Sequence, residues 1–437
     1  MILSKLANFK INIEEWNIID LRIDIPDLGP GSDAINRHTQ YSNPIATVKK
    51  LNIEGVGAGF TLGLGNNLIC SAIEDILGLW NGLTLNEIAR ESSTDIYNIL
   101  SNPRQIRWLS PNSGVNYQAV GVIVNTIIDW IGKDERMPAW LMLAKVTESE
   151  FRDFYACPLN LSHVMQSEDY LFKQNNINYD YKNLAIRAYH TTWIGSSAKE
   201  LAKEIILINK EKGIKLFKLK IGKDPDIFLG KINELKSILP KGIQLCTDAN
   251  QTMDLDSAKK FISNADSLDI LWLEEPFAPD NIAAFKKLLE YRNSNNLRIE
   301  IVSGENCPSP HVAAALMEVG IDRFQADPCR MMGLVDILLV SQLGRFFNVP
   351  ITPHAGGSCL DELSLHISFY DQVQNNFNLE GALIENVGFC SHIMKFPSKV
   401  LDGMISPPLH PGFLVGFDEK VTIKFQNYKK GTTWLKL

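Results

Sequence analysis

The sequence repeats one pattern in LFKLKIG (residues 216–222), IQLCTDAN (243–250) and LDILWLEEP (268–276). Each stretch is a short apolar run that ends on a polar or charged side chain, and a segment with helical spacing follows it. The pattern also occurs in LAIRAYHT from 184, RIEIVSGE from 298, RFQADP from 323, VPITPHA from 349 and ALIENV from 382. Eight such units favour a parallel (β/α)8 barrel over an open doubly wound sheet. The glycine fingerprint of a dinucleotide-binding fold does not open the first unit.

The sequence before the predicted barrel follows a different pattern of strand-like and helix-like segments. Residues 1–130 mix strand-like segments, Gly-rich turns and helix-like runs over 66–80 and 117–131, which predicts an α+β domain. We expect residues 131–183 to connect this domain to a barrel at 184–395. The tail, 396–437, has no barrel unit left to build, so we expect it to pack back on the N-terminal domain. The predicted fold class is therefore α/β: a TIM-type barrel with an α+β capping domain formed by the N-terminal segment and the C-terminal tail.

Composition limits the partners of the chain. The 437 residues carry 43 Lys and Arg against 50 Asp and Glu, a formal charge of −7, and the basic residues form no cluster. This balance argues against a nucleic-acid or anionic-membrane surface. Seven scattered cysteines without a CxxC pair are typical of a reduced intracellular chain. We identify no signal peptide and no uninterrupted apolar span, so we expect a soluble, cytoplasmic protein without a membrane partner.

Three acids end three successive predicted strands: Asp248, Glu274 and Glu305. In a parallel barrel the C-terminal strand ends meet at one rim, where active sites are built. Three carboxylates at one rim repel one another unless a divalent cation neutralises them, and ligation by oxygen alone suits Mg²⁺. The alternative is that each acid only caps the helix that follows it.

Two lysines, Lys218 and Lys220, lie two residues apart on LFKLKIG, so both point to one face of the strand. If Phe217 and Leu219 pack outward under the helices, both ammonium groups enter the barrel mouth. We expect each cation to lower the pKa of the other, which would make a neutral base more accessible. The alternative is an edge strand with two solvated lysines.

His354 ends the seventh run, and Asp327 ends the sixth. A carboxylate one strand away can fix the tautomer of the imidazole and raise its pKa. The two glycines after His354 permit close approach of the backbone to a ligand, which favours a functional histidine over a structural one. Strands two and seven flank the acid-bearing strands, so Lys220 and His354 can reach opposite faces of one substrate. This arrangement suits proton abstraction α to a carboxylate, through an enediolate, with Mg²⁺ as the cofactor.

The motifs of this sequence resemble those of a known family. FKLKIG, TDAN, WLEEP, SGEN, QADPCR and PHAGG are similar to the enolase superfamily, in its mandelate racemase branch. GSDAIN at 31–36, Tyr41-Ser42, FTLGLGN at 60–66, RWLSP at 107–111 and the run PHAGGSCLDEL resemble the L-fuconate dehydratases of that branch, as do PPLHPGF and the final WLKL. The resemblance covers nearly the whole chain.

The resemblance implies a role for each matching residue. Asp248, Glu274 and Glu305 would hold Mg²⁺, Lys220 and His354 would be the acid–base pair, and Asp327 would support His354. The residues that it implies for the substrate are Lys218 and Asn250 at the carboxylate, Glu385 near the enediolate, and Gly31, Ser32, Asp33 and Tyr41 at the distal hydroxyls. Lys220 would remove the C2 proton of an aldonate and His354 would protonate the departing C3 hydroxyl, giving a 2-keto-3-deoxy acid. The family also implies a homo-oligomer.

The chain departs from the family in the sugar pocket. It has CPSP at 307–310 in place of a polar stretch that ends in Arg, and Gln251-Thr252-Met253 in place of Gln-Arg-Trp. His38-Thr39-Gln40 replaces Asp-Pro-Asp, and the segment HTTWIGSSA is shorter. The metal and acid–base positions are intact, so the sequence predicts the reaction class more firmly than the sugar.

Two other functions fit the same residues. A racemase or epimerase of a 2-hydroxy acid needs two bases on opposite faces of its substrate, as this site would supply. The polar capping segment GSDAIN favours a polyhydroxy substrate, in which a β-hydroxyl makes elimination the natural outcome. A catalytically silent barrel that only binds acid sugars is the other alternative. Such a protein is expected to have lost a ligand or a base, and the sequence retains them all.

Overall fold

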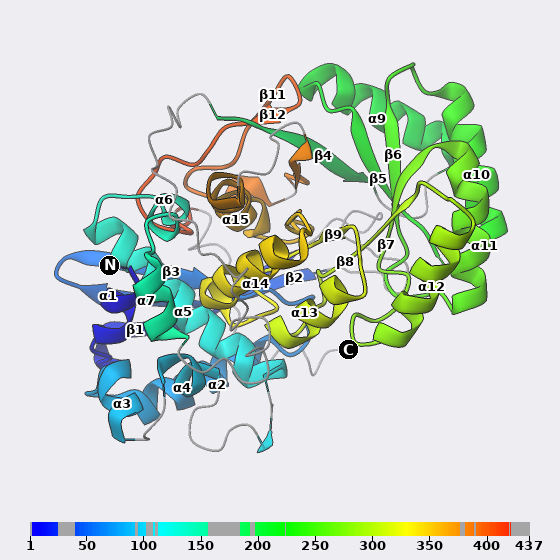
Figure 1. The fold of residues 1–437 in the computed structure, drawn as a ribbon. Helices are drawn as coiled ribbons and strands as arrows, with labels where there is room; N and C mark the ends of the chain where they lie inside the picture. The colour runs from blue at the N-terminus through cyan, green and yellow to red at the C-terminus, as the bar shows by residue number, and fades with distance from the viewer. Residues whose placement is uncertain are drawn as a thin grey trace.

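The structure is a computed structural model that describes residues 2–24, 40–91, 95–101, 108–109, 112–155, 184–192, 197–222, 224–375, 381–388, 390–418 and 420. Its centre is a barrel of parallel strands (Figure 1). The strands follow one another around it in chain order: β4 (Ile186–Thr192), β5 (Leu216–Lys220), β6 (Gln244–Asp248), β7 (Ile270–Glu274), β8 (Glu300–Ser303) and β9 (Arg323–Phe324). The last, β10 (Leu383–Glu385), pairs in parallel with β4. The predicted barrel fold is confirmed.

The seventh predicted run forms a single bridge and no strand. Ile351 pairs in parallel with Phe324, and the backbone N–H of Thr352 and of His354 donate to Phe324 and Ala326 at 2.8 and 3.1 Å. Pro350 and Pro353 explain the short pairing, because proline has no N–H to continue a ladder. The run still occupies the expected place beside β9.

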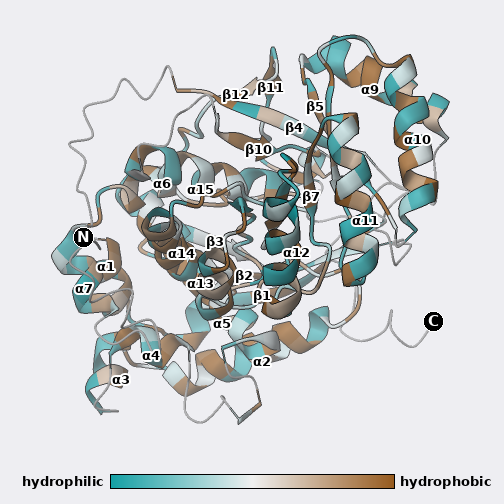
Figure 2. Cartoon of the chain, turned by 45° about the vertical axis from the view of Figure 1, so that its right-hand side comes forward, coloured by the Kyte–Doolittle hydropathy of each residue, from teal (hydrophilic) through white to brown (hydrophobic). Residues whose placement is uncertain are grey.

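Helices cover the outside of the barrel (Figure 1). They are α9 (Ala198–Lys212), α10 (Pro225–Ile238), α11 (Leu255–Ala265), α12 (Ile282–Ser294), α13 (Pro310–Glu318), α14 (Gly333–Phe347) and α15 (Leu360–Asn375). Short 3₁₀ turns occur at Ile13–Glu15, Asp266–Leu268 and Ser391–Ile393. Helix α14 carries the hydrophobic colour over much of its length in Figure 2 and is buried on all sides over residues 333–344.

Strand alternation builds the barrel interior in two layers. The lower layer is an apolar cluster with one residue from each of six strands: Tyr189, Leu216, Cys246, Trp272, Val302 and Leu383. Two residues further along four of these strands, and therefore pointing the same way, stand Lys218, Asp248, Glu274 and Glu385. The charged layer therefore lies directly above a layer of buried apolar side chains.

The N-terminal domain has an antiparallel sheet of β1 (Trp16–Asp24), β2 (Gln40–Lys50) and β3 (Ile53–Ala58). Its helices are α1 (Ile2–Asn8), α2 (Asn66–Trp80), α3 (Leu85–Glu91), α4 (Ile96–Ser101), α5 (Gly114–Asp134), α6 (Ala139–Leu143) and α7 (Glu148–Phe154). Helices α2 and α5 contain the two predicted helical runs. Helix α5 packs on β3 and on α14, so it connects this capping domain to the barrel.

The described part of the tail contacts the barrel as well as the capping domain on which we expected it to pack. The hairpin of β11 (Val400–Leu401) and β12 (Met404–Ile405) adds antiparallel to the start of β4 (Figure 1). Further along, Phe413 donates its N–H to Asp129 of α5 at 2.6 Å, and Gly412 bridges to Pro138. The hairpin reaches the barrel because β4 exposes an unpaired edge at its N-terminal end.

The two domains meet at a close backbone contact. A methyl group at Gly121 of α5 would lie 2.7 Å from the carbonyl oxygen of Met331 and 2.8 Å from the N–H nitrogen of Gly333. Gly333 itself has φ of +64°, and Asn125 accepts the N–H of Leu334 at 2.9 Å. Only a residue without a side chain at position 121 lets α5 approach α14 this closely.

A buried carboxylate also bridges the domains. Asp336 of α14 accepts hydrogen bonds from the hydroxyls of Tyr97 and Tyr117 of the capping domain at 2.9 and 2.6 Å, and from the N–H of Met332 at 2.9 Å. Burial raises the pKa of Asp336 from 3.8 to about 6, against the opposing effect of these donors.

Among the described residues, no helix is both long and apolar enough to cross a membrane. The six described cysteines are buried and free, while Cys157 lies outside the described residues.

Gly121→Ala should destabilise the protein by about 1–3 kcal/mol, because the added methyl group meets backbone atoms that cannot move independently. Gly78→Ala on α2 is the matched control: nothing lies within 4 Å of its added methyl group. It should be neutral or stabilise by up to about 1 kcal/mol. Urea unfolding of both variants measures the effect, and equal stability would contradict the proposed close contact.

Asp336 should make stability fall as the pH rises from 3.8 to about 6. The folded state keeps its proton to a higher pH than the unfolded state, so the stabilisation is complete below pH 3.8 and lost through the folded pKa. Relative to Asp336→Asn, the wild type should lose about 3 kcal/mol over this range. Parallel curves of unfolding free energy against pH would rule out the shift.

Candidate metal centre and acid–base site

The structure brings Asp248, Glu274 and Glu305 together at the C-terminal mouth of the barrel. One carboxylate oxygen of each lies within 4.8 Å of the others. Asp248 and Glu274 are fully buried and Glu305 is 7% exposed. These acids do not cap the helices that follow them. Asp254 accepts the N–H of Ser257 in the first turn of α11, and Asn281 accepts that of Ala284 in the first turn of α12. Ser309 occupies the N-cap position of α13. The capping alternative is therefore excluded.

The donor set fits a hard divalent cation. All three groups offer oxygen, the ligand that Mg²⁺ prefers. Oε2 of Glu305 is buried and accepts no hydrogen bond from the described residues, and its nearest cationic partner is Nε2 of His354 at 3.5 Å. A buried carboxylate oxygen without a donor is costly unless a charge compensates it, so this oxygen is suited to a metal.

Lys218 lies at the centre of the acids. Its Nζ is 2.6 Å from Glu274, 3.0 Å from Glu385 and 3.7 Å from Asp248. It also lies over the ring of Tyr189 in the apolar floor, 5.8 Å from the centroid. Because β5 pairs with β4 on one side and β6 on the other, it is not an edge strand. Both lysines point into the barrel mouth, as the alternation predicted.

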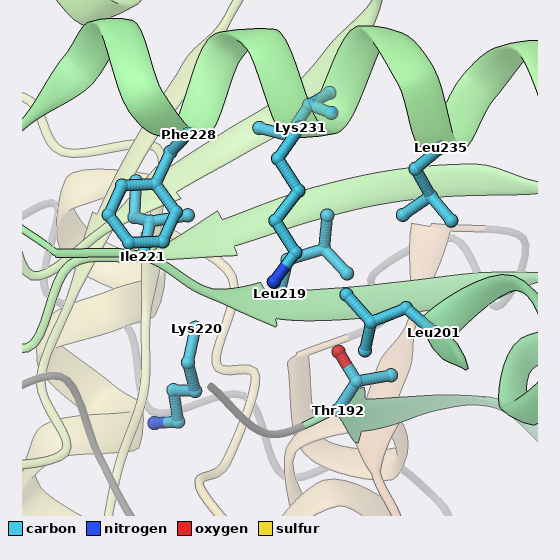
Figure 3. A pocket seen from close by; sticks show the side chains of 9 residues that line it. Thr192, Leu201, Leu219, Lys220, Ile221, Phe228, Lys231 and Leu235 are labelled. Atoms are coloured by element: carbon cyan, nitrogen blue, oxygen red, sulfur yellow. The ribbon is translucent and has the colours of Figure 1, made fainter. Parts of the chain in front are cut away.

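Lys220 forms an ion pair with Asp248. Figure 3 shows Lys220 on the opposite side of β5 from Phe228, Lys231 and Leu235, which face the strand from α10. Leu219 and Ile221 line that outer side. The strand therefore separates the catalytic candidate from the packing layer beneath α10.

The lysine pKa values differ from our expectation. Burial lowers the pKa of Lys220, but the attraction of Asp248 and Glu305 outweighs both burial and the repulsion of Lys218, and its pKa lies above the ordinary value. The pKa of Lys218 is also raised, because Glu274 and Glu385 outweigh its desolvation. The expected lowering is wrong for the metal-free site, since the acids are closer and more numerous than the single neighbouring cation.

His354 and Asp327 form the expected pair. Nδ1 of His354 lies 2.9 Å from Asp327, which leaves Nε2 facing Glu305. Burial lowers the pKa of His354, but Glu305 and Asp327 outweigh it and the pKa is raised. A methyl group at Gly356 would lie 2.6 Å from Nε2 of His354. The absence of a side chain at Gly356 therefore leaves room for the imidazole of His354. Gly356 is one of the two glycines at which we expected the backbone to approach a ligand closely.

The remaining predicted residues surround this centre. Glu385 accepts the N–H of Ala355 at 2.8 Å and the hydroxyl of Thr191. Burial raises the pKa of Glu385, but the positive charges of Lys218 and His354 outweigh burial and hold this pKa well below the usual range. Asn250 donates its N–H and its amide to Asp248, at 2.9 and 3.3 Å.

Tyr41 from the capping domain donates its hydroxyl to the carbonyl of Gly356 at 3.5 Å. It packs edge-on against Phe60, with ring centroids 5.1 Å apart, and Phe60 in turn lies against Gly357. The capping domain thus contacts the loop that follows His354. Gly31, Ser32 and Asp33 lie outside the described residues.

Sequence reasoning missed two side chains in this region. Phe60 supports the His354 loop, and its place in the Gly-rich turn GFTLGLG was the available signal. Gln325 is 1% exposed, and neither its amide oxygen nor its amide nitrogen has a hydrogen-bond partner among the described residues. It precedes Asp327 by two residues and so shares its face, a signal that strand alternation could have given.

Three buried carboxylates that could hold a metal ion, with a lysine at one end and a histidine at the other, are the type of site found in α/β-barrel enzymes that use metal and acid–base chemistry. Residues 200–421 match the family described as Enolase C-terminal domain-like. The chain belongs to the enolase superfamily.

Relatives match over nearly the full length. The chain is 28% identical to the L-galactonate dehydratase of Hypocrea jecorina over 418 residues, 92% of each chain. It is 28% identical to human mitochondrial enolase superfamily member 1 over 443 residues, 97% of this chain and 98% of the relative. The crystal structure of that human protein superposes with a TM-score of 0.87, at 24% identity over 99% of both chains. An L-talarate/galactarate dehydratase from Salmonella typhimurium LT2, liganded with Mg and L-lyxarohydroxamate, superposes with a TM-score of 0.72 at 19% identity, over 94% and 92% of the two chains.

Lys218→Met should destabilise the metal-free protein by about 3–5 kcal/mol, because it leaves Glu274 and Glu385 buried without their cation. Mg²⁺ should restore part of this loss. Lys260→Met is the matched control, since the exposed pair of Lys260 with Asp226 at 2.6 Å should contribute at most about 1 kcal/mol. Urea unfolding in EDTA measures both variants, and a Lys218→Met protein as stable as the control would contradict the charge balance described.

Proposed function

We propose that this chain is a Mg²⁺-dependent dehydratase of acid sugars, acting on an aldonate similar to L-fuconate. The observation that carries the proposal is the placement of Lys220 and His354. Lys220 contacts Asp248, His354 lies 3.5 Å from Glu305, and the three carboxylates lie between them. The names of the relatives, L-galactonate dehydratase and L-talarate/galactarate dehydratase, support the same reaction class.

Asp248, Glu274 and Glu305 would hold the cation. When bound, Mg²⁺ would supply positive charge that balances these acids. The same charge would stabilise the enediolate and so acidify the C–H bond next to the substrate carboxylate. The charge on Lys218 favours an anionic substrate in an otherwise acidic site, and Asn250, beside Asp248, is the further group proposed for its carboxylate.

The reaction is a proton abstraction followed by elimination. Lys220, in its neutral form, takes the C2 proton, and the C–H electron pair moves toward C1 to give an enediolate. The C3–O bond then breaks as His354 gives its proton to the departing hydroxyl, which leaves as water. The resulting enol takes up a proton and becomes a 2-keto-3-deoxy acid. The contact between Nδ1 of His354 and Asp327 at 2.9 Å supports its role as the acid, because a carboxylate at that nitrogen stabilises the protonated imidazole.

Racemisation of a 2-hydroxy acid is the second candidate, since two proton carriers on opposite sides of the triad could exchange the same C2 proton. The two reactions differ in their products. In D₂O a racemase leaves deuterium at C2 of its product, whereas the dehydratase converts C2 into the carbonyl carbon and incorporates deuterium at C3 of the 2-keto-3-deoxy acid.

Incubation with Mg²⁺ and a library of acid sugars should give a 2-keto-3-deoxy acid, detected with semicarbazide. Proton NMR of the same mixtures in D₂O would report racemisation through C2 exchange without loss of water. If the metal-loaded protein forms no 2-keto-3-deoxy acid from any library member, the proposed dehydratase is wrong, and C2 exchange without loss of water would indicate a racemase in its place.

Lys220→Ala and His354→Asn should each lower turnover by at least about 100-fold, because each removes one proton carrier. Binding of the metal should persist in both. Lys231→Ala and His392→Asn are the controls: Lys231 faces the outer side of β5 and His392 is exposed, so both should keep wild-type turnover. Full activity in Lys220→Ala or His354→Asn would refute the assigned role.

Two further predictions from the sequence are retained as proposals, a homo-oligomeric state and a cytoplasmic location. Sedimentation equilibrium of the purified chain, with a mass of 49.0 kDa per subunit, tests the first.

A further inference from the structure

We propose that Glu275, the second acid of WLEEP, is a positioning residue that sets the geometry of the metal ligands through its hydrogen bonds to neighbouring turns. The inference rests on the proposed function, because it assigns Glu275 to the metal centre formed by Asp248, Glu274 and Glu305. Glu275 is fully buried. It follows Glu274 directly, so its side chain leaves the strand end in a different direction from that of its neighbour.

Glu275 joins the segments that follow two other strands. Its Oε2 accepts the side-chain amides of Gln251 and Asn306, both at 2.9 Å, and its Oε1 accepts the N–H of Asn306 at 3.2 Å. Gln251 comes after β6, and Asn306 after β8. One carboxylate therefore connects the ends of three successive strands, each of which supplies one metal ligand.

The connection reaches the ligands themselves. Asn306 also donates its amide to Oε1 of Glu305, at 3.2 Å, so Glu275 orients the group that fixes the third ligand. On the other side, Gln251 donates its own N–H to the carbonyl of Glu275 at 2.7 Å. Gln251 directly follows Asn250, which donates to Asp248. The route to Glu305 consists of hydrogen bonds alone, whereas the route to Asp248 passes through the peptide bond between Gln251 and Asn250.

The backbone in these turns adopts an unfavourable conformation that the hydrogen bonds hold in place. Asn250, Gln251 and Glu275 have φ of +43°, +64° and +38°, and glutamine and glutamate are uncommon in this region. Such strain persists only where the surroundings over-determine it, and it clusters at functional sites. Without the carboxylate of Glu275, the turns after β6 and β7 would lose the side-chain hydrogen bond between them and keep only their backbone contacts.

Only a carboxylate satisfies these donors. Three N–H groups converge on Glu275, and each of its two oxygens accepts at least one of them. Glutamine would turn its own N–H₂ group toward at least one of the donors. A graded effect therefore follows: glutamine should weaken the metal site in part, and alanine should weaken it further.

Binding of Mn²⁺, followed by EPR in the absence of substrate, tests the inference. Mn²⁺ accepts the same oxygen ligands as Mg²⁺. Glu275→Ala should weaken Mn²⁺ binding by about 10–100-fold, the usual effect of removing a partner of a metal ligand, and Glu275→Gln should fall between it and the wild type. The EPR spectrum of bound Mn²⁺ should also change, which loss of stability alone would not cause.

Asp336→Asn is the matched control, because Asp336 is another fully buried, triply hydrogen-bonded carboxylate in the barrel, and it does not contact the triad. It should alter stability and leave Mn²⁺ affinity unchanged. Wild-type Mn²⁺ affinity in folded Glu275→Ala would overturn the inference. If the alanine variant does not fold, wild-type Mn²⁺ affinity in Glu275→Gln would overturn it. Absence of Mn²⁺ binding in the wild type would overturn the metal site itself, and the inference with it.

Discussion

The crowding of buried carboxylates at the mouth of the barrel is the constraint on which the rest of the structure depends. Asp248, Glu274, Glu305 and Glu385 lie together at 0–7% exposure, and Lys218 is the buried cation that contacts three of them. Burial and the neighbouring Asp248 raise the pKa of Glu274 well above its usual value. A divalent cation held by the three carboxylates would stabilise their ionised forms, and its binding energy would become part of the stability of the site.

The other features of the fold serve this charge cluster. The buried apolar cluster that includes Tyr189 and Leu383 lies below it, and Lys218 lies over the ring of Tyr189. The capping domain closes over the side of His354 through Tyr41 and Phe60. Glycine at positions 121 and 333 lets α5 and α14 come close enough to hold the two domains together. The site is therefore preorganised by both domains, although its acids and bases all come from the barrel.

Much of this could be predicted from the sequence, because strand alternation and βα spacing are local patterns with a direct geometric meaning. Lys218 and Lys220 on one face, and three acids at three strand ends, required only the period of a strand. The shortened seventh pairing was not predicted, although Pro350 and Pro353 on either side of Ile351 were visible. The pKa values of the lysines could not be predicted, because they depend on distances between strands that the sequence does not contain. Glu275 was missed because its role lies in contacts with Gln251 and Asn306, which are near it only in the folded chain.

We propose that the three carboxylates form one metal centre between Lys220 and His354. Diffraction from crystals soaked in Mn²⁺, recorded at the manganese absorption edge, would locate such a metal. We expect one strong anomalous peak per chain, bounded by oxygens of Asp248, Glu274 and Glu305 at metal–oxygen distances of about 2.0–2.6 Å. No peak at this position at millimolar Mn²⁺, or a stronger peak elsewhere in the chain, would contradict it.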